Sequence, residues 1–341
     1  MNYILKNENA LFYECGYSCD NALFLKLENE AFFITDARYV FEAKEFVKNA
    51  QIILAQDLFA KARELLTNNV IKKISFDPKD FTCFDFKELS KDSVIEFEEK
   101  LDLSKNKRII KTAQELEILQ KSVNFGKECF DEFAKFISKE GHGKSEKELW
   151  FKACEIFQKK GKLGLSFSPI VAINENAAKA HALPSEKKLE FGDLLLVDAG
   201  VVYQRYCSDR TRTACFDENG IIFDKDKPNF KDKEIAQIYE VVKQAQLKAI
   251  EKARVGMKAS ELDFIAREVI KNAGFEKEFI HSLGHGVGLD IHELPNISPR
   301  SDLELKEGMV FTIEPGIYIQ DKLGIRIEDM VYLTKEKAVV L

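Results

Sequence analysis

The sequence contains a gapless internal repeat that joins an apolar strand to a single carboxylate. Residues 192–200 read GDLLLVDAG and residues 308–316 read GMVFTIEPG. Each copy places one acid two positions before its second Gly, Asp198 in the first and Glu314 in the second. A carboxylate among apolar residues costs free energy unless a cation or hydrogen bonds compensate it. The repeat therefore predicts two related halves that contribute matching acids to one site, such as a metal site.

The repeat extends on both sides of these strands. The tetrapeptide HALP at residues 181–184 precedes the first copy, and HELP at residues 292–295 precedes the second. A further acid follows each copy, in what we expect to be a second strand: Asp209 and Glu328. One such acid can be a salt-bridge partner of a nearby arginine, of which the sequence offers Arg210, Arg212 and Arg326. Four together favour metal ions, because charged groups are rarely buried without partners.

Length and pattern predict two domains, residues 1–107 and residues 108–341, because 341 residues exceed a typical single domain. The first domain alternates short strands and helices, as in an α/β layer. The second has an α+β pattern with a pseudo-twofold internal repeat, in which each half opens with two helices. Their predicted positions are 112–138, from Ser145 to near 161, 233–254, and from Ser260 to near 274. The spacing predicts that Ser145 with Glu148, and Ser260 with Asp263, cap the second helix of each half. The polar run 101–108 is the predicted linker.

Composition excludes several classes of protein. A net charge of −6 argues against a nucleic-acid-binding protein, which normally carries a basic patch. No apolar run approaches the ~20 residues that span a bilayer, so we expect no membrane association. The first residues lack the pattern of a signal peptide. Seven cysteines without a CxxC pair suit unpaired thiols in a reducing compartment, so we expect a cytoplasmic location.

Four of the five histidines lie near the repeated acids: His181, His281, His285 and His292. His285 stands between glycines, which allow close backbone approach and leave its imidazole available to a ligand. Four carboxylates and one imidazole suit two divalent ions, foremost Mn²⁺, with Zn²⁺, Co²⁺ and Fe²⁺ as alternatives. Two such ions can share and activate a bridging water. The other histidines would then bind substrate and stabilise an oxyanion.

The motifs VDAG, SDRTRT, GHGVGLDIHELP, TIEPGIY and GIRIEDMV resemble those of the pita-bread metallopeptidases. That family includes Xaa-Pro aminopeptidases, prolidases and methionine aminopeptidases, and the resemblance covers about residues 110–341. Residues 1–107 resemble the creatinase-type N-terminal domain of the proline-specific branch, with ITDARY at residues 34–39. The resemblance implies a pita-bread catalytic domain with two metal ions and five ligands, which are Asp198, Asp209, His285, Glu314 and Glu328.

The resemblance also implies a role for each ligand. Asp209 and Glu328 would bridge both ions, and Asp198 would bind one ion through both oxygens. His285 and Glu314 would complete the other ion, and Glu314 would accept a proton from the nucleophilic water.

Three histidines fall where the family contacts its substrate. His292 would stabilise the tetrahedral intermediate, and His281 would contact the residue after the scissile bond. His181 joins them in substrate binding and, with His292 and Glu314, in the catalytic set. Tyr318 and Arg326 complete the substrate-binding set.

The function predicted from these residues is that of an Xaa-Pro aminopeptidase, acting on peptides with proline in the second position. Prolidases often carry an arginine where this chain has Asn296, although Arg300 lies four residues on. An Xaa-Pro dipeptidase is the alternative, and a non-catalytic peptide-binding scaffold is the alternative of another class. Methionine aminopeptidases have a longer interval than 328 − 314 = 14 residues, and creatinases lack the metal ligands. A homodimer is expected.

Three positions depart from the family pattern. Arg205 and Asn174 stand where glycine is frequent, so a local turn is expected to differ at each. Arg210 stands where relatives are usually apolar, and it either pairs with a ligand carboxylate or faces solvent.

Overall fold

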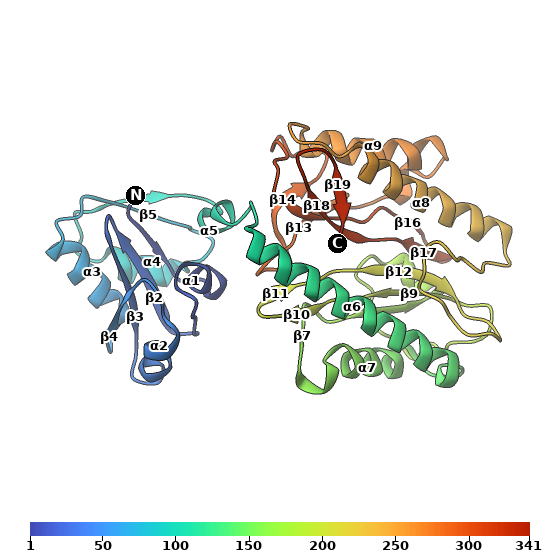
Figure 1. Cartoon of the computed structure of the whole chain (residues 1–341), viewed down its shortest axis with the longest axis horizontal. Helices are drawn as coiled ribbons and strands as arrows, with labels where there is room; N and C mark the ends of the chain where they lie inside the picture. Colours follow the sequence, from blue (N-terminus) through green and yellow to red (C-terminus); the bar gives the residue numbers. More distant parts are fainter. The chain divides into compact units, whose positions relative to one another are not determined.

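The computed structural model describes all residues 1–341, which form two compact units, Met1–Arg108 and Ile109–Leu341 (Figure 1). Each unit has its own hydrophobic core. The substrate and metal residues predicted from the sequence all fall in the second unit.

The first unit is a six-stranded mixed sheet with helices on both faces. The strand order is β4-β3-β2-β1-β5-β6, with bounds Gln51–Leu54, Glu30–Thr35, Ala22–Leu27, Tyr3–Leu5, Lys73–Phe76 and Glu96–Glu99. The helices are α1 (Glu8–Cys15), α2 (Val40–Phe46), α3 (Leu58–Asn68), α4 (Cys83–Ser90) and α5 (Leu103–Lys107). Alternate strand residues enter opposite cores, Phe33 with α1 and α2, and Phe32 with α3 and α4. This is the predicted α/β layer.

The segment predicted as a polar linker folds as part of the first unit. Helix α5 occupies most of it, and Leu103 and Ser104 are buried. Asp77 anchors the helix, because its carboxylate accepts the backbone N–H of Leu103 at 3.0 Å. The polar composition of residues 101–108 predicted a linker, because a contact with Asp77, a distant residue in the sequence, cannot be inferred from composition.

Two pairs of helices open the two halves of the second unit. They are α6 (Ala113–Glu140) with α7 (Glu146–Phe157), and α8 (Lys233–Lys252) with α9 (Ala259–Asn272). The predicted capping box of Ser145 and Glu148 is present at α7. The prediction for α9 is wrong in detail: the helix starts before Ser260, and Glu261 accepts the backbone N–H of Lys258 at 3.0 Å. Asp263 is therefore free to act elsewhere.

Each half contains a sheet whose central strand carries the repeated sequence. In the first half the order is β12-β9-β8, with bounds Thr211–Cys215, Leu194–Asp198 and Ile170–Ile173. In the second half it is β14-β13-β15-β18-β19, with bounds Glu293–Ile297, Gly284–Gly286, Val310–Ile313, Asp329–Leu333 and Ala338–Val340. β9 and β15 are thus each flanked by antiparallel neighbours. This correspondence is the structural form of the repeat.

Two smaller sheets complete the second unit. They are β11-β10-β7, with bounds Tyr206–Cys207, Val201–Tyr203 and Gly164–Leu165, and β16-β17, with bounds Gly316–Ile319 and Leu323–Arg326. Asp209 lies between β11 and β12, and Glu328 lies between β17 and β18. Both acids were expected inside strands. They instead occupy the junctions where the chain leaves one sheet and enters another, because the strands on either side pair with different partners.

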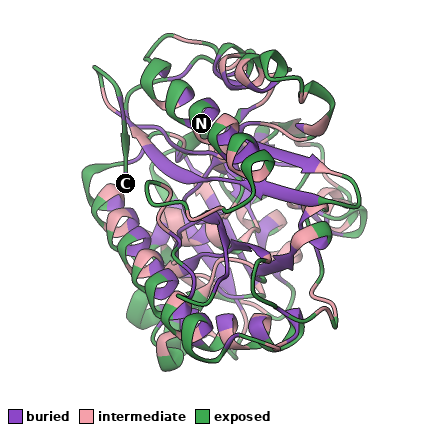
Figure 2. Ribbon diagram, turned by 90° about the vertical axis from the view of Figure 1, so that its right-hand side faces the viewer, coloured by how far each residue is buried: buried purple, intermediate pink, exposed green.

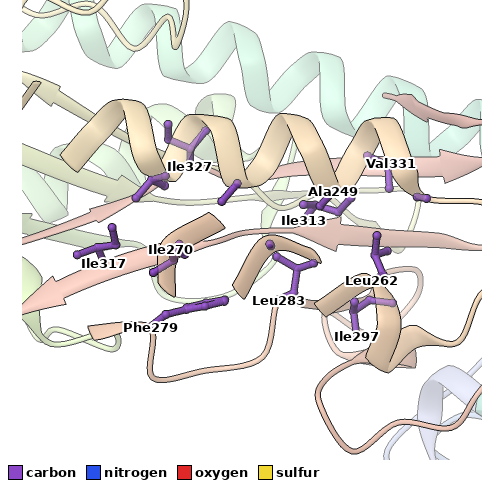
Figure 3. Close-up of a cluster of buried hydrophobic side chains, with 14 of the residues drawn as sticks. Ala249, Leu262, Ile270, Phe279, Leu283, Ile297, Ile313, Ile317, Ile327 and Val331 are labelled. Carbon is purple, nitrogen blue, oxygen red and sulfur yellow. The ribbon is translucent and has the colours of Figure 1, made fainter. Parts of the chain in front are cut away.

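Each half packs its helices on its own sheet. Figure 2 shows buried positions concentrated on the strands and on one side of each helix. In the second half, Ala249 of α8, Leu262 of α9, Ile313 and Ile327 belong to one apolar cluster, in which Ala249 lies beside Ile313 and Leu262 beside Ile297 (Figure 3). None of the helices is both long and apolar enough to cross a membrane.

The two positions where the family often has glycine adopt the backbone that favours glycine. Arg205 has φ 72° and follows Gln204 with φ 48° in the tight turn between β10 and β11. Asn174 has φ 48°, and its side chain supports this turn by bonding Asp193 at 2.6 Å and the N–H of Leu194 at 2.7 Å. At both positions the chain therefore accommodates a side chain in the left-handed region.

Candidate active site

A cavity of about 670 Å³ in the second unit collects nine of the ten residues that the sequence nominates. They are His181, Asp198, Asp209, His281, His285, His292, Glu314, Arg326 and Glu328. The tenth, Tyr318, does not line the cavity, but its hydroxyl lies 2.8 Å from Nε2 of His281. The fold thus brings together side chains that are up to 147 residues apart, since 328 − 181 = 147.

The lining of the cavity includes all five candidate metal ligands. One ligand atom each from Asp209, His285 and Glu328 lies within 4.8 Å of the others. Nε2 of His285 is 3.5 Å from Oδ2 of Asp209 and 3.4 Å from Oε1 of Glu314. Since Asp209 comes from the first half and the other three from the second, the cluster lies at the join of the repeat.

Unsatisfied carboxylate oxygens test whether this cluster fits a metal. Oδ1 of Asp198, Oδ1 of Asp209 and Oε1 of Glu328 are buried and have no hydrogen-bond partner. Leaving a buried charged acceptor unpaired is costly, so such atoms are rare in proteins. An oxygen-rich set with one imidazole fits hard divalent cations.

Burial and crowding raise the pKa of the acids in the cluster. Desolvation is the largest cause for Asp209 and Glu328, and repulsion from neighbouring carboxylates raises their pKa further. Desolvation also raises the pKa of Glu314 to about 7. Bound cations would reverse both effects, because they favour the ionised form.

His285 is prepared to act as a neutral ligand. Its Nδ1 lies 3.1 Å from the carbonyl oxygen of Gly286, so Nδ1–H donates there and Nε2 keeps its lone pair toward the carboxylates. Burial, aided by His292, lowers the pKa of His285 to about 4, which leaves the imidazole uncharged near neutral pH.

Arg326 links the two halves beside the cluster. Its Nη2 pairs with Oδ2 of Asp198 at 2.6 Å, Nη1 donates to the Tyr318 hydroxyl at 2.8 Å, and Nε donates to Thr211 at 2.9 Å. The sequence offered a salt bridge to arginine as an alternative role for each strand acid, and the structure shows such a bridge at one oxygen of Asp198.

Arg210 does not pair with a candidate ligand. Its guanidinium lies over the ring of Phe130, 5.6 Å from the centroid, and this contact with an aromatic ring explains how an arginine can stand where relatives are usually apolar.

Two threonines orient the ligands and were not nominated from the sequence. The Thr211 hydroxyl donates to Oε2 of Glu328 at 2.6 Å. The Thr312 hydroxyl donates to Oε1 of Glu314 at 3.1 Å and accepts the backbone N–H of His285 at 3.1 Å. Both are fully buried, in strands β12 and β15 beside the acids. Their signal in the sequence is polarity at buried strand positions, visible in SDRTRT and VFTIEPG.

The three other histidines form the walls of the cavity. Both ring nitrogens of His281 are bonded within the protein: Nδ1–H donates to the Ser282 carbonyl at 2.7 Å, and Nε2 accepts from Tyr318 at 2.8 Å. The ring of His292 lies 4.3 Å from that of His285, centroid to centroid. His181 is largely exposed at the cavity. Apolar side chains complete the lining, including those of Phe167, Ile170, Leu183, Pro184 and Ile291.

Known families match both parts of the chain. Residues 117–335 match Metallopeptidase family M24, and residues 2–105 match the Creatinase/Prolidase N-terminal domain. An Xaa-Pro dipeptidase of Pyrococcus horikoshii is 36% identical over 335 residues, which cover 97% of this chain and 89% of that protein.

Solved structures agree in fold over nearly the whole chain. An Xaa-Pro dipeptidase from Bacillus anthracis superposes with a TM-score of 0.91 at 31% identity, covering 99% of this chain and 92% of that one. An X-Pro aminopeptidase from Thermotoga maritima superposes with a TM-score of 0.87 at 30% identity, covering 99% and 94%. The predicted family and the pita-bread fold with its N-terminal domain are confirmed.

Proposed function

This chain belongs to metallopeptidase family M24, and we propose that it is an Xaa-Pro dipeptidase, which hydrolyses dipeptides with proline in the second position. The observation that carries the proposal is the similarity over nearly the entire chain to proteins named Xaa-Pro dipeptidase. The aminopeptidase predicted from the sequence becomes the second candidate.

One observation favours that second candidate. Asn296 lines the cavity, whereas Arg300 does not, and the only arginine in the lining is Arg326. The guanidinium of Arg326 is already bonded to Asp198, Tyr318 and Thr211. The cavity therefore offers no arginine in reserve for the carboxylate of a dipeptide.

We propose that Asp198, Asp209, His285, Glu314 and Glu328 hold two divalent ions, Mn²⁺ before Zn²⁺, Co²⁺ or Fe²⁺. When bound, such ions supply an acidified water as nucleophile. Glu314 suits the proton acceptor, because burial raises its pKa to about 7.

The walls of the cavity would bind and orient the substrate. His292 and His181 line the cavity, and we propose that they hydrogen-bond the reacting carbonyl, which would stabilise negative charge in the transition state. With both nitrogens of His281 engaged, we propose that it contacts substrate through its carbon edge, with Tyr318 and Arg326 fixing the ring. The apolar lining suits a proline ring, whose tertiary amide has no N–H to donate.

We also propose that the two domains divide near residue 107, as the division into units Met1–Arg108 and Ile109–Leu341 supports. The resemblance to the family supports a homodimer. A reducing cytoplasmic environment suits the seven cysteines, all of which are unpaired.

The discriminating experiment compares three peptides with the purified, Mn²⁺-loaded protein: Met-Pro, Met-Pro-Ala and Met-Ala. We expect kcat/KM for Met-Pro to exceed that for Met-Pro-Ala at least about tenfold, a difference of about 1.4 kcal/mol in transition-state binding. The opposite ratio would establish the aminopeptidase. Cleavage of none, by protein with a full metal complement, would indicate the scaffold. Glu328→Gln is the control, which we expect to be folded, metal-poor and inactive.

A further inference from the structure

Three buried carboxylates of the second unit stand outside the metal cluster and behind the walls of the cavity. Glu146 and Asp263 are at most 1% exposed, and Glu293 is 2% exposed. Each contacts a different loop, and each of these loops carries one of the three histidines that do not belong to the ligand set. We propose that Glu146, Asp263 and Glu293 are positioning residues that set the histidine walls of the substrate cavity; the assignment of those walls rests on the proposed function.

Glu146 fastens both ends of the loop that carries His181. Its Oε1 accepts the backbone N–H of Ile173 at 2.6 Å, and its Oε2 accepts the N–H of Ser185 at 2.7 Å. Oε2 also accepts from the amide of Asn176 at 2.7 Å, and that amide donates to the carbonyl of Leu183 at 3.0 Å. One carboxylate on the first turn of α7 thus closes a loop of which residues 180–184 all line the cavity.

Asp263 fastens the loop that carries His281. Its Oδ1 accepts the backbone N–H of Leu283 at 2.9 Å, and its carboxylate pairs with Arg267 one turn later on α9 at 2.8 and 3.1 Å. Arg267 in turn donates to the carbonyls of Phe279 and His281, each at 2.9 Å. The backbone on both sides of His281 is therefore bonded to one acid–base pair on a helix.

Glu293 holds the loop of His292 through a fully buried ion pair. Its Oε2 lies 2.7 Å from Nζ of Lys111, and the two side chains are 0% and 1% exposed. Its Oε1 accepts the backbone N–H of Asp290 at 3.1 Å. The pair fills space that glycine provides, since a Cβ on Gly288 would lie 2.5 Å from Oε2 of Glu293. His292 is the preceding residue, so its backbone position follows from this contact.

The anchors do not occupy equivalent positions of the internal repeat. Glu146 is the first residue of α7, whereas Asp263 lies one turn into α9, after Lys258 and Glu261 have capped that helix. Glu293 has no counterpart either, because the residue after His181 is Ala182. Each half still anchors one histidine loop from its second helix, and the second half holds a further histidine with a buried ion pair.

Isosteric variants remove an anchor without leaving a cavity: Glu146→Gln, Asp263→Asn and Glu293→Gln. Each turns one acceptor oxygen into a donor that faces another N–H, which is unfavourable in a buried site. The matched controls are the same kind of change at exposed acids, Glu155→Gln on α7, Glu268→Gln on α9 and Glu307→Gln before β15.

The first readout is the NMR spectrum of histidine ring protons in the Zn²⁺-loaded protein, in which five histidines give five assignable signals. We expect Glu146→Gln to move or broaden the signal of His181, Asp263→Asn that of His281, and Glu293→Gln that of His292. His142, outside the cavity lining, is the internal reference. The proposal is overturned when folded variants leave these signals where the controls leave them, or when all cavity histidines respond alike to each variant.

The second readout is steady-state kinetics on Met-Pro at full metal occupancy. Asp263→Asn should raise KM about tenfold and change kcat less than about twofold, because a displaced wall weakens substrate binding before chemistry. In a His281→Ala background the same change should have no further effect on KM, as expected for a residue acting through His281. Lower thermal stability with unchanged KM would show a purely structural role and overturn the proposal. If the wild-type protein cleaves no Xaa-Pro peptide, the proposed function fails, while the NMR readout still decides this inference.

Discussion

At the scale of single residues, the site is defined by side chains that are unfavourable without a cation. Asp209 and Glu328 each have a buried oxygen with no partner, and burial raises the pKa of both. Asp198 differs, because Arg326 compensates one of its oxygens. Arg326 therefore supplies one permanent positive charge at the site, and bound cations would neutralise the remaining negative charge of the carboxylates.

Thr312 tests how far hydrogen bonds around the ligands control metal binding. Its hydroxyl contacts Glu314 and the backbone of His285, so Thr312→Val removes two bonds while preserving shape. We expect the Kd for Mn²⁺, measured by calorimetry, to rise about tenfold to a hundredfold, as is usual when such supporting partners are lost. Thr312→Ser keeps the hydroxyl and should bind nearly as the wild type does. Equal affinity in the Val and Ser variants would contradict the role of the hydroxyl.

At the scale of elements, the acids lie where strands end. Asp209 and Glu328 occupy equivalent junctions, at which the chain passes from a small sheet to β12 or β18. A residue at such a junction is released from the alternation of a strand, so its side chain can turn toward the cavity. Short turns with left-handed backbone, as between β10 and β11, bring these strands into place.

The turn at Arg205 leads to a stability prediction. A non-glycine residue at φ 72° costs about 1 kcal/mol relative to glycine. Arg205→Gly should therefore raise the free energy of unfolding by up to about 1 kcal/mol, measured by urea denaturation. The matched control is Lys162→Gly, at an exposed position with φ −78°, where glycine relieves no strain and should not raise the free energy of unfolding. Destabilisation of similar size by both variants would show that the strain at Arg205 is compensated.

At the scale of the whole molecule, the repeat explains why a cavity exists at all. Each half buries its own core between its helices and its sheet, and the acids of both halves meet at the join. Each half alone supplies only part of the proposed ligand set: Asp198 and Asp209 come from the first, and His285, Glu314 and Glu328 from the second. The only imidazole ligand belongs to the second half, so two bound ions would be inequivalent.

The raised pKa of Glu314 predicts how pH and metal binding together affect the stability of the protein. In the metal-free protein, burial raises the pKa of Glu314 to about 7, above its ordinary value of 4.5. Between these values the folded state holds a proton that the unfolded chain has released, so the stability of the metal-free protein falls as pH rises through this window. Metal requires the ionised ligands, so stabilisation by Mn²⁺ should grow over the same range.

Thermal unfolding with and without Mn²⁺, between about pH 5.5 and pH 8, measures this effect. We expect the difference in Tm to be larger at the higher pH. In Glu314→Gln the metal-free protein should lose part of its pH dependence. A difference in Tm that is independent of pH in the wild type would contradict the raised pKa.

The family, the five candidate ligands and the helices that begin near Thr112 and Ser145 could be predicted from the sequence. The hairpin of β2 and β3 also follows from pattern alone. These features are encoded in short stretches, since caps, turns and alternation depend on neighbouring residues. The internal repeat added a long-range inference, because two copies of one motif must meet symmetrically to share a site.

Other features of the fold and of the candidate site depend on contacts between residues that are distant in the sequence. Polarity predicted a linker at 101–108, but Asp77 holds that segment as a helix. Spacing made Asp263 a helix cap, whereas it bonds Leu283 and Arg267 behind the cavity. Polarity within an apolar strand marks Thr312 but does not reveal its partners, and the anchors Glu146 and Glu293 carry no local signature, because these hydrogen bonds depend on which strand or loop becomes the neighbour. The sequence by itself determined which chemistry this chain contains, and only the tertiary structure decided which side chains hold that chemistry in place, because burial and hydrogen bonding are properties of the folded neighbourhood.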